Sequence, residues 1–266
     1  MKINKSLIIL VILLGVLLAI AFYCRSSIET KIGNKTGPVA QRPHIPPEKP
    51  AEPQPPPKID LLEGFPAYSQ QSGTSCGPCA VRNMLKHVTG TLHAESKLHK
   101  EVIEEDQKGL EHLAPELRRL GIPNPRMLSR RGTTPIGNTA VLNKYLGAGH
   151  VAKYKQIDSF EDRKQLIIKS INNDLPVMVP LVSGGFQHWT VCIGYDLEKE
   201  TFTCVNAGLG ASQGRPEGGS YNTVNFQSFD DANSFKNMPS GMMGRVYELA
   251  NKEGIGKCVL IYIEKK

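Results

Sequence analysis

The chain has 266 residues, of which 40% are hydrophobic, and 32 Lys and Arg against 25 Asp and Glu produce a formal net charge of +7. This composition is typical of a globular protein and excludes a disordered or fibrous chain. Residues 1–58 carry eight basic and three acidic side chains, so residues 59–266 have a net charge of only +2. A nearly neutral main part argues against a nucleic-acid-binding surface, and we expect no nucleic-acid partner.

The first predicted element is an uncharged run rich in Leu, Ile and Val from Leu7 to Cys24, which we assign with its flanks to residues 1–25. As a helix these 18 residues would span about 27 Å, enough to cross a bilayer core. We therefore expect a single-pass membrane anchor with the rest of the chain in the aqueous phase. Ala19-Ile20-Ala21 also fits a cleavage site, so a removed signal peptide and a secreted protein remain an alternative. Basic residues on both sides of the run leave its orientation open.

A proline-rich segment follows the hydrophobic run, in residues 26–58. Nine of the twenty residues from Pro38 to Pro57 are proline, and few of the others are apolar. Such a segment is typical of an extended polyproline-type spacer. We expect it to hold a folded domain at a distance from the membrane, with that domain spanning residues 59–266.

From Ile59 onward the sequence shows helical and strand patterns. Helices are predicted at Pro78–Val88, Leu110–Leu120, Asn138–Leu146 and Phe160–Ile171. Strands are predicted at Leu175–Val182, His188–Tyr195, Thr201–Asn206 and Lys257–Ile263. Helices followed by antiparallel strands indicate an α+β fold in a single domain.

Six cysteines stand at positions 24, 76, 79, 192, 204 and 258. Their spacing is not that of a small disulfide scaffold. A zinc site built from Cys76, Cys79, Cys192 and Cys204 is a weak hypothesis, because eleven residues separate the second pair. We expect no metal and no organic cofactor.

Cys76-Gly77-Pro78-Cys79 contains the Cys-Gly-Pro-Cys motif of thioredoxin-like redox proteins. A thioredoxin fold places a strand, a helix and a strand before this motif. Only the seventeen residues 59–75 separate it from the proline-rich segment, which is too few for those elements. A thiol-disulfide oxidoreductase that uses Cys76 and Cys79 therefore remains an alternative rather than the main hypothesis.

Gln70 stands six residues before Cys76, and a predicted helix follows directly. This segment resembles the papain-like cysteine peptidases, in particular their C39-like branch. The resemblance implies a papain-like fold, in which a nucleophile-bearing helix packs on an antiparallel β-sheet. It also implies that Cys76 is the nucleophile and that the Gln70 side chain and the Cys76 backbone N–H form an oxyanion hole.

The segment from His188 to Asp196 resembles the one that carries the catalytic histidine in the same family. The strands on either side of the short polar stretch 196–200 should form a hairpin, and a turn centred near residue 197 would bring His188 opposite a residue near 206. That residue is Asn206, which matches the orienting Asn or Asp of the family. Asp196 cannot take this role, because eight strand residues separate it from His188 by roughly 26 Å. His150 is the reserve base.

The resemblance thus implies a membrane-tethered cysteine peptidase that cleaves peptide or isopeptide bonds of a protein or peptide substrate. The short pattern of Cys76, Ala80 and Asn83 is also similar to one group of papain-fold deubiquitinases, so an isopeptidase stays open. An acyl- or amide-transferring enzyme on the same fold and an inactive binding module stay open as well. The sequence leaves the oligomeric state open.

Overall fold

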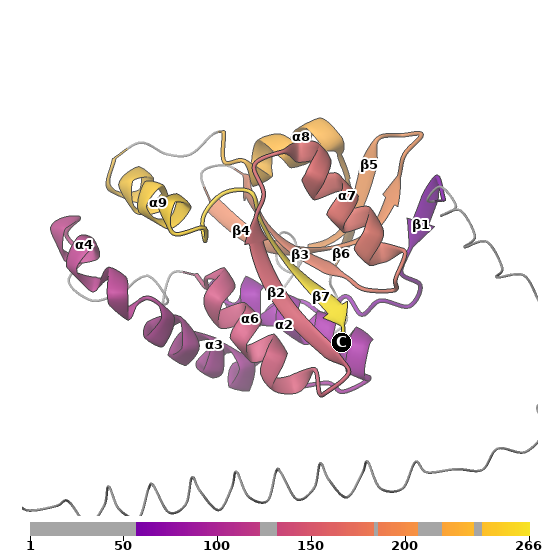
Figure 1. The fold of residues 1–266 in the computed structure, drawn as a ribbon. Coiled ribbons are helices and arrows are strands. Elements are labelled where there is room, and N and C mark those ends of the chain that lie inside the picture. The colour runs from indigo at the N-terminus through magenta and orange to yellow at the C-terminus, as the bar shows by residue number, and fades with distance from the viewer. Residues whose placement is uncertain (1–56, 123–131, 184–185, 207–219, 237–240) are drawn as a thin grey trace, which may run out of the picture. The chain divides into compact units, whose positions relative to one another are not determined.

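The computed structural model of the protein describes residues 57–122, 132–183, 186–206, 220–236 and 241–266 (Figure 1). The predicted membrane anchor and almost all of the proline-rich segment lie outside these residues. Within the described part of the chain, no helix combines the length and apolar character that a membrane span requires. The anchor therefore stays a prediction from the sequence.

The described strands form a seven-stranded sheet in which every pairing is antiparallel. Its strand order is β2-β7-β3-β4-β5-β6, and β1 pairs with β4. The strands are β1 (Ile59–Leu61), β2 (His150–Gln156), β3 (Val177–Ser183), β4 (Phe186–Asp196), β5 (Thr201–Asn206), β6 (Ser220–Asn225) and β7 (Val259–Lys265). The last strand in the sequence lies between β2 and β3, so the C-terminal segment completes the sheet.

Helices cover both faces of this sheet (Figure 1). They are α2 (Cys76–Thr89), α3 (Glu95–Gly109), the 3-10 helix η1 (Glu111–Leu113), α4 (Ala114–Arg119), α6 (Pro135–Tyr145), α7 (Phe160–Ile171), α8 (Phe226–Asn233) and α9 (Met242–Lys252). Helices α2 and α6 lie on one face, with α3 packed against both, and α7 and α8 lie on the other. The expected α+β fold, with the Cys76 helix packed on an antiparallel sheet, is confirmed.

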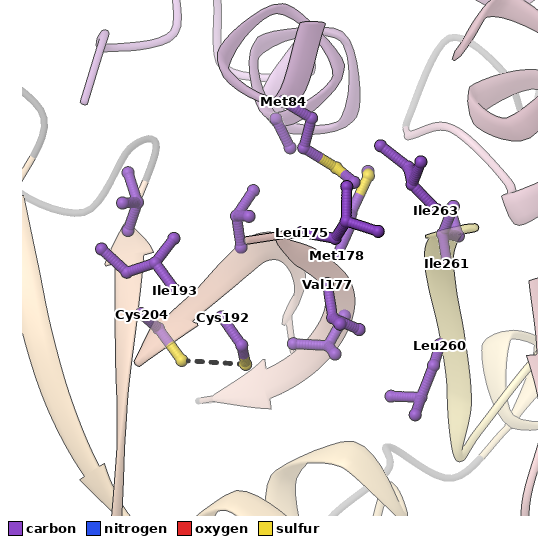
Figure 2. Close-up of a cluster of buried hydrophobic side chains, with 14 of the residues drawn as sticks. Met84, Leu175, Val177, Met178, Cys192, Ile193, Cys204, Leu260, Ile261 and Ile263 are labelled. Carbon is purple, nitrogen blue, oxygen red and sulfur yellow. Dashed lines mark hydrogen bonds between the residues drawn. The ribbon is translucent and has the colours of Figure 1, made fainter. Parts of the chain in front are cut away.

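The main hydrophobic core joins α2 to the central strands. Met84 of α2 points toward the sheet, and Met178, Ile261 and Ile263 lie near it (Figure 2). Because helices cover both faces of β3, its residues 177–179 are an uninterrupted apolar run with no exposed surface. This packing fixes α2, and thereby Cys76, relative to the strands.

Helix α3 is absent from the sequence-based prediction. Its buried positions include Leu98 and Val102, which have the spacing of a helix face, but also Glu95 and Asp106. Two carboxylates on the buried side make the apolar periodicity too weak to recognise in the sequence. Both carboxylates have partners that are distant in the sequence, and this compensates for their burial.

Asp106 joins α3 to the beginning of α6. Its carboxylate accepts hydrogen bonds from the backbone N–H groups of Thr134 (2.9 Å) and Gly137 (2.7 Å) and from the Thr134 hydroxyl. Burial nevertheless outweighs these bonds and raises the pKa of Asp106 from 3.8 to about 6.

This raised pKa predicts a pH dependence of stability. The folded state binds the Asp106 proton more tightly than the unfolded state. The contribution of this proton binding to the free energy of unfolding is therefore complete below pH 3.8 and is lost as the pH rises through about 6. Asp106→Asn removes this titration. Urea unfolding between pH 4.5 and 7.5 should therefore show the wild type losing stability relative to the variant as the pH rises. Parallel stability curves would contradict the assignment.

Candidate active site

Cys76 is the first residue of α2, where the unpaired N–H groups of the first helical turn favour negative charge. The space around the next residue, Gly77, shows how closely this turn is packed. A Cβ atom on Gly77 would lie 2.0 Å from Thr133 Oγ1 and 2.9 Å from Asn138 Oδ1. The glycine is therefore required because α2 approaches the beginning of α6 so closely, whatever chemistry Cys76 performs.

We expect Gly77→Ala to destabilise the protein by about 3 kcal/mol, because the added methyl group must displace buried, hydrogen-bonded side chains. Gly73→Ala is the matched control, since a Cβ at Gly73 would meet nothing within 4 Å. Thermal unfolding measures both variants. A Gly77→Ala variant as stable as Gly73→Ala would show that the first turn of α2 has room for a side chain.

Cys76 is only 7% exposed, and its helix packs against β4. Burial raises the pKa of Cys76, and the nearby charge of Glu95 adds to this; hydrogen bonds from the backbones of Trp189, Gly77 and Cys76 itself lower it. The bond from Trp189 places the Cys76 sulfur beside the residue that follows His188. A thiolate here needs these donors and a proton acceptor, since burial alone disfavours its charge.

His188 is half-buried in β4, and the strand is held in place at this point. The indole Nε1 of Trp189 donates a hydrogen bond to the Thr133 carbonyl at 2.8 Å. Thr133 in turn lies against Gly77, so the same short segment contacts both the Cys76 helix and the His188 strand. The structure thus brings together the segments of Cys76 and His188, which are distant in the sequence.

The β4–β5 hairpin places Asn206 differently from the sequence-based prediction. Asn206 pairs with Thr190, and His188 pairs with Leu181 of β3. The Asp196 carboxylate accepts the N–H groups of residues 198 and 199, and the resulting turn at 197–200 shifts the pairing by three residues. The bulge between Cys192 and Gly194 shifts it back by one. Because side chains alternate along a strand, positions 188 and 190 share a face. Asn206 is therefore a diagonal neighbour of His188.

The loop that carries Gln70 is anchored by Glu95, the first residue of α3. The Glu95 Oε1 atom accepts a hydrogen bond from the Gln71 backbone N–H at 2.6 Å and another from the Ser75 hydroxyl at 2.6 Å. Gln71 directly follows Gln70, and Ser75 directly precedes Cys76. One buried carboxylate therefore fixes the chain next to both residues.

Arg82 on α2 completes this anchor. Its Nη2 atom lies 3.2 Å from Glu95 Oε2 and donates to the Ser69 carbonyl at 2.9 Å. The residues on both sides of Gln70 are thus held by the Arg82–Glu95 ion pair. The sequence alone does not reveal this pair, because the apolar pattern of α3 is too weak to place Glu95 on a helix.

Cys79 lies in a different environment from Cys76. Its thiol donates to the Tyr68 carbonyl at 3.1 Å, and burial together with the Glu95 charge raises the pKa of Cys79 to about 12, although the Arg82 charge lowers it. A thioredoxin-like motif would be preceded by a strand, a helix and a strand, whereas the described residues 57–75 contain only β1. This arrangement disfavours a thiol-disulfide oxidoreductase that uses Cys76 and Cys79.

The structure supports neither His150 as the base nor a zinc site. His150 begins β2, which β7 and β3 separate from β4, a lateral distance of roughly 14 Å. His150 is therefore not brought to Cys76. Within the described ranges, no group of three or more His, Cys, Asp and Glu side chains is arranged to hold a metal ion, so the four cysteines of the hypothetical zinc site do not converge.

Comparison with known proteins identifies the family. The model of the peptidase C39-like family matches residues 62–233, which is more than half of the chain and includes the positions of Gln70, Cys76, His188 and Asn206. This chain belongs to the peptidase C39-like family. The resemblance seen in the sequence is confirmed, and the protein is accordingly a cysteine-type peptidase. No curated protein matches the chain.

Two solved structures show low similarity to this C39-like chain. The Pseudomonas avirulence protein AvrPphB is 10% identical, with 77% of this chain and 99% of that chain covered and a TM-score of 0.32. Xylellain, a cysteine protease from Xylella fastidiosa, is 12% identical, with 78% of this chain and 86% of that chain covered and a TM-score of 0.39.

The C39-like match ends at residue 233, so α9 lies outside it. Burial raises the pKa of Tyr247 of α9, and the charge of an ionised Cys76 raises it further. The Tyr247 ring meets Phe235 edge-on, with centroids 5.5 Å apart. Val246, Leu249 and Ala250 have the apolar spacing of a helix face, a signal that could have predicted α9.

Proposed function

We propose that this C39-like protein hydrolyses peptide bonds of a protein or peptide substrate. In this proposal Cys76 is the nucleophile, His188 the base and then the acid, and Asn206 the group that orients the imidazole. The Gln70 side chain and the Cys76 backbone N–H stabilise the oxyanion. The observation that carries the proposal is the contact of Thr133 with both elements: it lies against Gly77, next to Cys76, and its carbonyl accepts a hydrogen bond from the indole of Trp189, next to His188.

The proposed reaction begins when His188 accepts the thiol proton and the Cys76 thiolate attacks the scissile carbonyl carbon. The negative charge that develops on the carbonyl oxygen is stabilised at the N-terminus of α2. His188 then donates its proton to the leaving amine, and water hydrolyses the acyl-enzyme. The rigid anchoring of the chain at Ser69, Gln71 and Ser75 supports this proposal, since an oxyanion hole needs donors that are already in position.

Labelling with an electrophilic peptide probe tests this proposal. In the wild-type protein we expect the probe to modify Cys76 and to leave Cys79 unmodified, as mass spectrometry of the digested protein would show. The reason is that Cys76 lies at the N-terminus of α2, near the strand of His188, whereas the Cys79 thiol donates a hydrogen bond to the Tyr68 carbonyl. Modification of Cys79 instead of Cys76 would overturn the assignment.

We further propose that residues 1–25 anchor the protein in a membrane and that residues 26–58 form the spacer. The uncharged run from Leu7 to Cys24 supports the anchor. A chain beginning at Gln54 keeps Pro57 and Lys58, whose carbonyls accept bonds from the Tyr195 hydroxyl and the Leu197 N–H. It should be labelled by the same probe as the full chain, whereas only the full chain should co-sediment with lipid vesicles. Vesicle binding by both chains would contradict the anchor.

A further inference from the structure

Two cysteines outside the proposed site face each other across the β4–β5 hairpin. Cys192 and Cys204 are directly opposite in the strand register, and their sulfur atoms are 3.2 Å apart (Figure 2). Both are free thiols with at most 1% of their surface exposed. Cys192 lies four residues along β4 from His188, or roughly 13 Å, so the proposed reaction does not use it.

The backbone pattern of β4 favours a covalent bond between these two residues. The Pro180 carbonyl of β3 accepts a hydrogen bond from the Asn233 side chain at 2.9 Å, and proline has no N–H, so the Pro180–Trp189 pair exchanges no backbone hydrogen bonds. Successive residues of a strand direct their backbone N–H and C=O groups alternately toward its two neighbouring strands. Trp189 therefore directs them toward β5, and Cys192, three residues later, directs them toward β3. The Cys192–Cys204 pair is consequently also a non-hydrogen-bonded pair, the type in which opposite Cα atoms are only about 4.5 Å apart.

This spacing agrees with the geometry of disulfides, whose Cα atoms lie about 4.4–6.8 Å apart. The sulfur atoms need to approach by only about 1.2 Å to reach the length of an S–S bond. We propose that Cys192 and Cys204 form a cross-strand disulfide when the chain folds in the presence of an exchangeable disulfide, and that this bond joins the strand of His188 to the strand of Asn206. The proposal is independent of the proposed peptidase reaction.

The step is a thiol–disulfide exchange with an external disulfide such as oxidised glutathione. The thiolate of one cysteine attacks a glutathione sulfur and releases one glutathione thiol, and the second cysteine then displaces the other. The two protein thiols lose two electrons and two protons, and one glutathione disulfide becomes two thiols. Burial raises the pKa of Cys192 well above its ordinary value, so exchange should be fast during folding and slow once the hairpin is packed.

The test refolds the full chain in detergent with either reduced or oxidised glutathione. Free thiols are then alkylated under denaturing conditions, and the digested protein is analysed by mass spectrometry. In the oxidised sample we expect a peptide in which Cys192 is linked to Cys204, with both residues protected from alkylation. The reduced sample should have both alkylated. A midpoint of thermal unfolding about 5–10 °C higher in the oxidised sample would support the structural role of the bond.

Cys192→Ser should remove the linked peptide and leave Cys204 either alkylated or joined to glutathione, because no second cysteine displaces the glutathione. The control Cys258→Ser should leave the link intact. The proposal is overturned if both cysteines of the wild type remain alkylatable after refolding with excess oxidised glutathione. A link from Cys192 or Cys204 to a different cysteine would overturn it equally. Since these readouts need no peptide substrate, they decide the proposal even if the peptidase mechanism fails.

Discussion

Replacing Cys76 with Ala should reduce peptide hydrolysis by a factor of about 10³ or more, because the variant has no nucleophile to form an acyl-enzyme. The substitution removes only a sulfur atom at a helix end. The fold should therefore persist, and circular dichroism and thermal unfolding would verify this. The measurement is kcat/KM on a peptide substrate that the wild type cleaves.

Cys79→Ala is the matched control for this experiment, because both cysteines are buried in the first turn of α2. It removes the bond from the thiol to the Tyr68 carbonyl but no group of the proposed reaction, so kcat/KM should fall by less than about 10-fold. Loss of activity in both variants, together with disulfide reductase activity in the wild type, would favour the Cys76–Cys79 redox hypothesis instead.

Replacing Glu95 with Gln should lower the free energy of unfolding by about 3–5 kcal/mol, since it leaves the Arg82 charge buried without its partner. The Arg82 and Glu95 side chains are 6% and 1% exposed, so solvent screens this interaction little. The variant also loses the carboxylate that holds Gln71 and Ser75, and we therefore expect kcat to fall further than the loss of folded protein explains. Urea unfolding and kinetics at a temperature where the variant is folded measure the two effects.

Two further variants separate stability from the positioning of the loop. Glu101→Gln on the same helix breaks an ion pair with Lys144, which is 57% exposed, and should cost less than about 1 kcal/mol. The double variant Glu95→Leu and Arg82→Met removes both buried charges and should recover much of the stability. Its kcat should stay low, because no carboxylate remains to accept the hydrogen bond from the Gln71 N–H that holds the loop of Gln70 in place. Full recovery of kcat would show that Glu95 acts on stability alone.

The sequence by itself determined the α+β class and the residues that resemble a C39-like site. Gln70 and Cys76 were recognised because the oxyanion donor and the nucleophile belong to one short segment before a helix. The β4–β5 hairpin was predictable because its two strands are adjacent in the sequence. Local patterns carry this information, since helix ends, strand alternation and short connections depend on neighbouring residues.

The tertiary structure decided the features that depend on residues far apart in the chain. The Glu95 carboxylate is needed because Gln71, twenty-four residues away in the loop of Gln70, folds against it, and no local pattern marks such a partner. Gly77 is required by the approach of Thr133. The position of the 197–200 turn and a bulge in β4 together set the partner of Asn206. Packing selects these contacts, because burial makes each of them favourable only when the distant segment is already in place.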